Sequence, residues 1–179
     1  MKRLLVFALP FLGVSLGVFA CDVPERGQID RPPSTRATQG DFLGAGVGLV
    51  FERRCGSLDC HGSVARNMRI YSSDGLRAPN EAGLGPGNGS TTNAEKLANY
   101  QSVLGVEPLA TREVLLGADP YTMLVMKKPL LIESHKGGGV FRQGDDTETC
   151  IYSWLTSDPD GGAVTNLAAC TAAANFPRE

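Results

Sequence analysis

The placement of its five cysteines constrains this 179-residue chain more than any other feature. The first, Cys21, follows an apolar stretch, residues 4–20, which is preceded by Lys2 and Arg3 and ends in a small residue. A charged start, an apolar centre and a small residue at the end are typical of a cleavable export signal, so we assign residues 1–20 to a signal peptide. Export to an oxidising compartment allows the later cysteines to form covalent cross-links.

We expect Cys21 to carry a lipid. Residues 18–21 (VFAC) resemble the lipobox of bacterial lipoproteins, in which the cysteine is acylated and becomes the new N-terminus, although Phe19 departs from that pattern. Residues 21–40 are polar and rich in proline, as suits a tether between a lipid and a folded domain. Cleavage by the ordinary signal peptidase is an alternative, and so is a retained membrane anchor, for which the apolar stretch is short.

The rest of the chain, residues 41–179, has the length of one domain. The chain contains 22 glycines and 11 prolines, and only 7% of its residues are aromatic. This composition predicts long irregular segments between the elements. The formal net charge is −2, and no cluster of basic residues could follow a phosphate backbone, which argues against nucleic acid as a partner.

Hydrophobic periodicity predicts a mainly α fold, a small bundle of three to five helices with long irregular loops. One helix is expected to begin near Asp41 and to end at Cys55. Further helices are expected from about Asn93 to Leu104, from Asp119-Pro120 to Met126, after Asp145 or Asp146, and from Val164 to Ala174. Residues 66–71 are an extended candidate, and residues 78–92 are expected to form a surface loop.

Residues 51–62 (FERRCGSLDCHG) hold two cysteines and a histidine in an order that points to haem. Cys55 and Cys60 are followed directly by His61. The segment resembles the attachment site of c-type cytochromes, in which two thiols add to the haem vinyl groups and the next histidine ligates the iron. The usual motif has two residues between the cysteines, whereas four stand here, a variant of some multihaem cytochromes that requires an extra bulge. A local disulfide, with His61 as a surface residue, is the alternative.

Four later segments stand in an order that resembles the cytochrome c domains of large exported proteins from planctomycetes and related bacteria. Residues 67–72 (NMRIYS) lead into a polar loop, and residues 119–129 (DPYTMLVMKKP) match a proline-led segment. A histidine and glycine cluster at 135–141 (HKGGGVF) is followed by a helical segment with tryptophan at 150–155 (CIYSWL). The resemblance spans residues 45–157 and implies a cytochrome c-like helical bundle that carries haem c with its iron.

The resemblance also bears on the second axial ligand that cytochrome iron normally takes. The chain has two histidines, His61 and His135, and the second stands in one of the resembling segments. Three glycines after His135 would let the backbone approach the haem face closely. Met126 and Met68 are alternative ligands, whereas Met123 is expected to pack in the core. An exposed His135 without a ligand role is the remaining alternative.

Cys150 and Cys170 remain once the other cysteines have been assigned, and we expect them to form a disulfide. Both lie in predicted helices. A disulfide that closes a loop of this length stabilises the fold by about 3 kcal/mol when its effect is treated as chain entropy. Two free thiols, or a zinc site shared with His135, are the alternatives.

The sequence therefore predicts an extracytoplasmic haem protein that a lipid on Cys21 anchors to a membrane of the cell envelope. The cytochrome c-like domain, residues 41–179, would transfer single electrons to or from redox partner proteins that the sequence does not identify. The resemblance favours an electron carrier over an enzyme, because a peroxidase would need an open coordination position on the iron. The alternative is a haem-free lipoprotein, stabilised by two disulfides, that acts as a binding or structural module.

Overall fold

A computed structural model of the chain describes residues 36–79, 89–158 and 164–175. They belong to a compact unit that begins at Pro32, and a separate unit comprises residues 1–31. The predicted signal peptide, the lipid site Cys21, most of the tether and residues 80–88 of the expected surface loop lie outside the described residues. Within the described ranges, no helix combines the length and the apolar character that crossing a bilayer requires.

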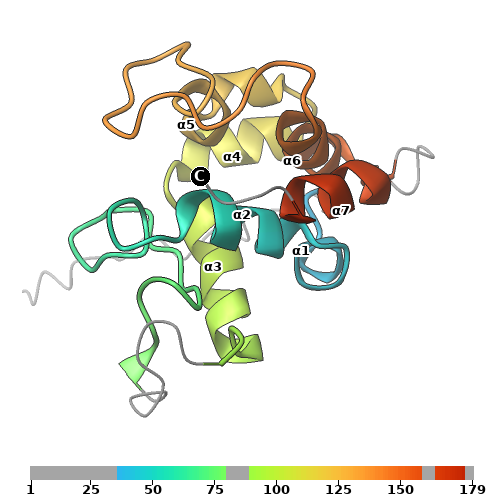
Figure 1. Cartoon of the computed structure of the whole chain (residues 1–179). Helices are drawn as coiled ribbons and strands as arrows, with labels where there is room; N and C mark the ends of the chain where they lie inside the picture. Colours follow the sequence, from blue (N-terminus) through green and yellow to red (C-terminus); the bar gives the residue numbers. More distant parts are fainter. Residues whose placement is uncertain (1–35, 80–88, 159–163, 176–179) are drawn as a thin grey trace, which may run out of the picture. The chain divides into compact units, whose positions relative to one another are not determined.

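The described residues form a mainly α fold, as the sequence predicted, and contain seven α-helices and no strand (Figure 1). The α-helices are α1 (Gln39–Gly44), α2 (Val47–Cys55), α3 (Asn93–Gly105), α4 (Pro108–Leu115), α5 (Leu124–Lys127), α6 (Asp146–Thr156) and α7 (Leu167–Asn175), with a short 3-10 helix, η2, at Pro120–Thr122. Helix α2 contacts α1, α3, α6 and α7, and α6 also packs closely against α7. Helix α2 is therefore held from several sides.

The segment from Asp41 to Cys55, expected as one helix, is divided between two helices. This division is one reason why the described residues contain more helices than the three to five predicted. The chain turns between α1 and α2 at Gly46, whose φ of 85° is a left-handed conformation that glycine adopts without steric cost. The turn brings Phe42 of α1 against Phe51 of α2, with ring centroids 5.8 Å apart. Helix α2 ends at Cys55, as predicted.

Helices α3, α6 and α7 occur close to where the sequence predicts them. Thr92 caps α3 through a capping box with Glu95, and the side chain of Asp145 caps α6. The segment after Asp119 is divided into η2 and α5. Helix α4 was not predicted, and the short element buries only two side chains, Thr111 and Val114.

Residues 66–71, the extended candidate, form no strand, and the only pairing in this region is an isolated bridge between Tyr71 and Leu76. The backbone of Tyr71 is satisfied by the side chain of Asn99 on α3 instead. Asn99 Oδ1 accepts from the Tyr71 N–H at 2.7 Å, and Asn99 Nδ2 donates to the Tyr71 carbonyl at 2.8 Å. An amide side chain thus takes the place of a neighbouring strand.

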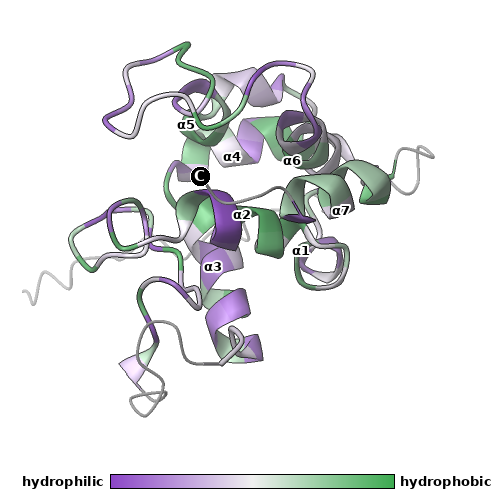
Figure 2. Cartoon of the chain, viewed as in Figure 1, coloured by the Kyte–Doolittle hydropathy of each residue, from purple (hydrophilic) through white to green (hydrophobic). Residues whose placement is uncertain are grey.

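The core has an aromatic centre. Phe42, Phe51 and Trp154 are almost fully buried and contact one another, with ring centroids 5.2 to 6.4 Å apart. Trp154 Nε1 donates to the carbonyl of Thr38, 3.1 Å away, and so ties α6 to the residue that precedes α1. Figure 2 shows α7 and the adjoining part of α2 as apolar (green), whereas much of α3 is hydrophilic (purple).

A disulfide joins Cys150 of α6 to Cys170 of α7, the pair expected from the sequence. The sulfur atoms are 2.04 Å apart, and the Cα atoms are 4.7 Å apart. The two helices that it links pack directly against each other. Neither a zinc site at these cysteines nor a pair of free thiols is compatible with this bond.

Candidate cofactor site

A cavity of about 620 Å³ lies at the C-terminal end of α2. Its wall is formed by α2, the loop that follows α2, helix α5 and the loop between α5 and α6. Apolar side chains such as Phe51, Val125 and Phe141 line part of it. A concave site of this size with an apolar wall and a few polar groups is typical of a bound small molecule or prosthetic group.

Both cysteines of the predicted attachment segment line this cavity. Cys55 is the buried last residue of α2, Cys60 is half-buried in the loop, and neither forms a disulfide. The His61 N–H donates to the Cys55 carbonyl at 2.8 Å, and the Cys60 N–H donates to the Ser57 carbonyl at 3.0 Å. These bonds curl the four intervening residues into a compact turn, so both thiols reach one cavity despite the long spacing.

Close backbone packing holds this turn in place. A Cβ on Gly62 would lie 2.1 Å from the Gly56 carbonyl oxygen, and one on Gly75 would lie 2.0 Å from the same atom. The Ser72 hydroxyl also donates to that oxygen, at 2.6 Å. Only residues without a Cβ allow these segments to approach so closely, so the two glycines fix the position of the attachment turn.

The loop that follows Cys60 fixes the orientation of His61. Nδ1 of His61 lies 2.9 Å from the carbonyl oxygen of Met68, so this nitrogen donates and Nε2 keeps its lone pair. Burial lowers the pKa of His61, and nearby His135 and Arg66 add to the shift, whereas the bond to Met68 opposes it. The neutral imidazole, which is the metal-binding form, is therefore favoured.

His135 reaches the cavity from the loop between α5 and α6. Nδ1 of its ring lies 2.8 Å from the carbonyl oxygen of Gly138, and the Gly138 N–H donates to the His135 carbonyl at 3.0 Å. Gly138 has a φ of 72°, a left-handed conformation that closes this small turn. The glycines after His135 thus serve to hold the imidazole with Nε2 available.

The two imidazoles lie at one cavity with a spacing that suits a shared metal ion. Their ring centroids are 6.2 Å apart, and their planes differ by 13°. Two imidazole nitrogens that bind one metal ion from opposite sides lie about 4 Å apart, and each centroid lies about 1 Å farther out, which gives about 6 Å between the centroids of rings that lie end to end. Together with the two thiols, the donor set of His61 and His135 fits a covalently attached haem.

The methionines occupy different places. Met68 is half-buried and lines the cavity. Met126, the other proposed alternative ligand, is fully buried in the core beside the cavity-lining residues but is not one of them. Met123 is fully buried in the core, as expected. Met68 is thus the methionine that remains an alternative to His135.

Arg66 is a site residue to which sequence reasoning gave no role. Its Nε donates to the Cys60 carbonyl and its Nη2 donates to the Asp59 carbonyl, both at 3.0 Å. The guanidinium therefore binds the backbone of the turn at the second cysteine. A basic residue a few positions after a Cys-His pair carries no recognisable signal by itself, because its role depends on how the loop folds back.

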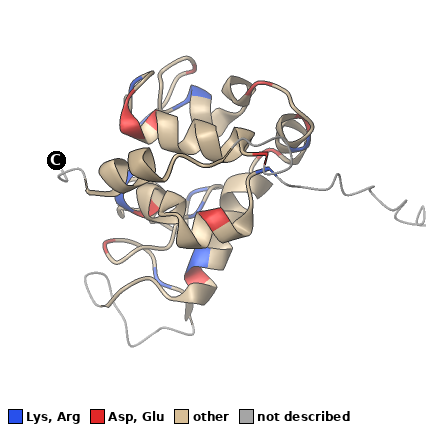
Figure 3. Cartoon of the chain, turned by 90° about the vertical axis from the view of Figure 1, so that its right-hand side faces the viewer, with Lys and Arg blue, Asp and Glu red and all other residues tan. Residues whose placement is uncertain are grey.

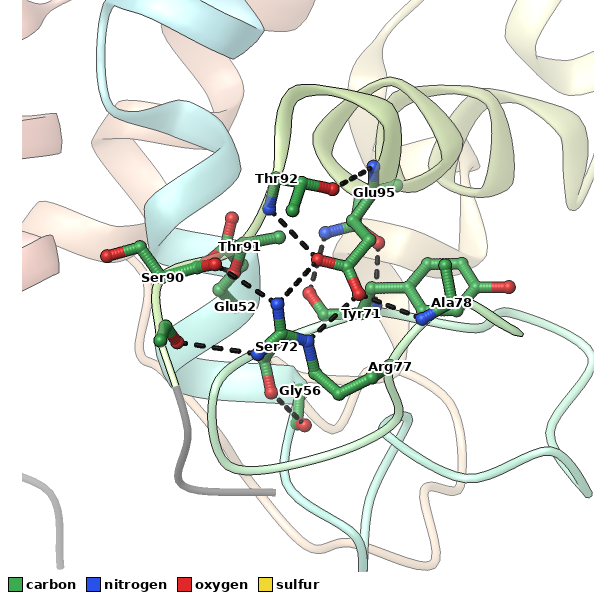
Figure 4. Close-up of polar contacts among 12 residues, drawn as sticks. Glu52, Gly56, Tyr71, Ser72, Arg77, Ala78, Ser90, Thr91, Thr92 and Glu95 are labelled. Atoms are coloured by element: carbon green, nitrogen blue, oxygen red, sulfur yellow. Dashed lines mark hydrogen bonds and ion pairs between the residues drawn. The ribbon is translucent and has the colours of Figure 1, made fainter. Parts of the chain in front are cut away.

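A buried ion pair fastens the segment behind the attachment turn to α3 (Figure 4). Arg77 donates to both carboxylate oxygens of Glu95 at 2.9 and 3.0 Å, and both side chains are almost fully buried. Burial favours the neutral form of Glu95, but the bonds from Arg77 and from the N–H groups of Thr92 and Ala78 outweigh it and lower the pKa to about 2. Glu95 therefore stays ionised.

Glu52 of α2 is the second buried carboxyl in this region (Figure 4). Thr91 donates to its Oε2 at 2.5 Å, whereas Oε1 has no hydrogen-bond partner among the described residues. Burial raises the pKa of Glu52, and Glu95 adds to the shift, whereas Thr91, Lys96 and Arg53 oppose it. Glu52 is not among the residues that line the cavity.

No protein-family model, no curated protein and no solved structure matches this chain. Among the described residues, no three His, Cys, Asp or Glu side chains cluster as ligands for a bare metal ion. Two imidazoles suit a metal whose other ligands come from a macrocycle.

Proposed function

We propose that this chain is an exported, lipid-anchored haem protein that carries single electrons in the cell envelope. In this proposal Cys55 and Cys60 would hold haem c through thioethers, and His61 and His135 would ligate its iron. The observation that carries the proposal is the pair of nearly parallel imidazoles, 6.2 Å between centroids, at the cavity that both thiols line. A lipid on Cys21 would keep the domain near membrane redox partners.

The bound haem would supply a one-electron couple, and the chain would supply its environment. The carbonyls of Met68 and Gly138 hold the imidazoles by their Nδ1 atoms, so each ring is oriented before it binds. Apolar side chains, among them Phe51 and Phe141, make part of the cavity wall apolar. Ligation of the iron by two imidazoles would favour an electron carrier over a peroxidase, which needs a position open to its substrate.

The decisive measurement is the absorption spectrum of protein produced in a host that matures c-type cytochromes. We expect a c-type spectrum that persists after denaturation and solvent extraction, because thioether bonds survive both. The double variant Cys55→Ala/Cys60→Ala should lose all covalent haem. The matched control, Cys150→Ala/Cys170→Ala, removes two cysteines that do not line the cavity. This variant should keep the covalent haem.

A different result would favour the haem-free alternative. If the mature protein has no visible band, and peptide mapping without reduction finds Cys55 linked to Cys60, the proposal is wrong. The chain would then be a lipoprotein with two disulfides that acts as a binding or structural module.

A further inference from the structure

The wall of the cavity is basic, although the chain as a whole is acidic. Four of the lining side chains are basic, Arg54, Arg66, Lys128 and Lys136, and one, Asp59, is acidic. The other described residues include eight basic and twelve acidic side chains. Figure 3 shows the acidic residues (red) spread over helices and loops. The positive charge is thus concentrated at the site, while the formal net charge of the chain is −2.

Two of these cations have no acidic partner among the described residues. Lys128 pairs with Glu133, at 3.1 Å. Arg66 donates its hydrogen bonds to two backbone carbonyls, and these neutral groups leave its charge uncompensated. No described carboxylate lies within ion-pair distance of Arg66 or Lys136. Arg66 is half-buried, Lys136 is exposed, and each lies on the loop of one histidine. An uncompensated charge therefore stands on each loop that carries an imidazole.

Exposed apolar side chains lie on the same two loops, drawn teal and orange in Figure 1. Leu58 and Val64, on the loop after α2, are 53% and 64% exposed. Leu131 and Ile132, on the loop after α5, are 58% and 61% exposed. Apolar and cationic side chains on the same loops suit a protein partner, since such interfaces combine apolar contact with a charged rim.

We propose that these two loops form the docking surface for a redox partner whose contact face is acidic. The inference rests on the proposed function, because it says where electrons would pass and which kind of protein would receive or deliver them. Arg66 and Lys136 attract acidic side chains, and Leu58 and Ile132 supply apolar contact. Charge attraction speeds the encounter and orients the partner, while the acidic remainder of the chain repels it elsewhere.

The first test uses a dye-labelled peptide of about ten glutamates as a model of an acidic face. Its binding to the full chain in detergent is followed by fluorescence anisotropy at low ionic strength. We expect binding despite the negative net charge, and weaker binding as salt is added. The variant Arg66→Gln/Lys136→Gln should bind at least about fivefold more weakly.

The matched control is Arg36→Gln/Arg112→Gln, which changes the net charge by the same amount at two residues that do not line the cavity. It should bind the peptide almost as the unaltered chain does. Circular dichroism of both double variants checks that they are folded. Equal weakening in the two pairs would mean that net charge alone governs binding, and the inference would be wrong.

The same titration is made on protein with and without haem, so that it remains informative if the proposed function fails. Binding that is lost when haem is attached would mean that the cofactor's own carboxylates occupy these cations, which would overturn the inference. Absence of haem from the spectrum overturns the proposed function, whereas peptide binding still decides whether this surface takes an acidic partner.

A second readout applies to the haem-loaded chain. Reduced protein is oxidised with anionic hexacyanoferrate(III) and, separately, with cationic tris(phenanthroline)cobalt(III). The anionic oxidant should react faster as ionic strength falls, and Arg66→Gln/Lys136→Gln should remove most of that dependence. A faster reaction with the cationic oxidant at low salt would contradict the proposed surface.

Discussion

Among single residues, the two histidines of the candidate site differ in how firmly the chain holds them. His61 follows a turn that several backbone hydrogen bonds close, and its ring is half-buried. His135 lies on a loop with exposed neighbours, and its ring donates a hydrogen bond to the carbonyl of Gly138 on the same loop. A substitution at His135 should therefore disturb the proposed haem site more than the fold.

We predict that His135→Ala keeps the covalent haem but loses the low-spin spectrum, because one axial nitrogen is removed while both thioethers remain. The measurement is visible absorption and electron paramagnetic resonance of the oxidised protein. Met68→Leu is the control, since its backbone carbonyl can still accept from His61. If Met68→Leu changes the spectrum and His135→Ala does not, methionine is the ligand.

Glu52 gives a prediction for stability. Because its pKa is raised in the folded state, protonation of Glu52 favours folding below the ordinary value of 4.5, and this contribution is lost as the pH rises through the raised pKa. Glu52→Gln keeps a partner for Thr91 and avoids the buried charge at neutral pH. We expect its melting temperature at pH 7 to rise by roughly 2–4 °C, with the gain shrinking towards pH 4. An unchanged gain at low pH would contradict this explanation.

At the scale of elements, the attachment turn depends on backbone contact more than on side chains. A Cβ on Gly62 would overlap the Gly56 carbonyl. Gly62→Ala should therefore destabilise the fold by about 1–3 kcal/mol and lower the fraction of chains that acquire haem. Gly105→Ala is the control, because a Cβ there meets no atom within 4 Å. Chemical denaturation and the haem content of both variants provide the measurement.

Helices that have both a capping residue and a helical repeat of apolar side chains could be predicted from the sequence. Thr92 and Asp145 precede such repeats, and α3 and α6 begin there. The break at Gly46 was missed because a glycine within a helical period does not reveal a left-handed turn. Helix α4 buries too few side chains to show a helical repeat of apolar residues. The extended candidate that ends at Tyr71 forms no strand, and Asn99, far along the chain, supplies hydrogen bonds to the backbone of Tyr71.

The candidate site could be predicted only where chemistry and spacing coincide locally. Cys55, Cys60 and His61 form one short motif, and His135 came from a resemblance between short segments. The structure brings all four to one cavity. Arg66 and the rest of the wall could not be predicted, because they come from separate loops and helices that meet only in the folded chain.

At the scale of the whole molecule, the disulfide joins α6 to α7 and closes the loop of chain between them. Cys150→Ala/Cys170→Ala should lower the free energy of unfolding by about 3 kcal/mol, because the unfolded chain regains the entropy of the closed loop. Denaturant titration measures the loss. If the same loss occurs when the unaltered protein is reduced, it comes from the bond and not from the missing side chains. Alkylation of both cysteines as free thiols in the unaltered protein would contradict the pairing.

Attachment of the whole molecule to a membrane should depend on one atom, the sulfur of Cys21, which lies outside the described residues. If the thiol is acylated, Cys21→Ser removes the anchor and leaves the domain beyond the tether unaltered. We expect the variant in the soluble fraction of the cell envelope, with the melting temperature and haem spectrum of the unaltered protein. Fractionation followed by spectroscopy of each fraction measures both. Retention of Cys21→Ser in the membrane fraction would show that the apolar segment stays attached, because a lipid can no longer account for the anchoring.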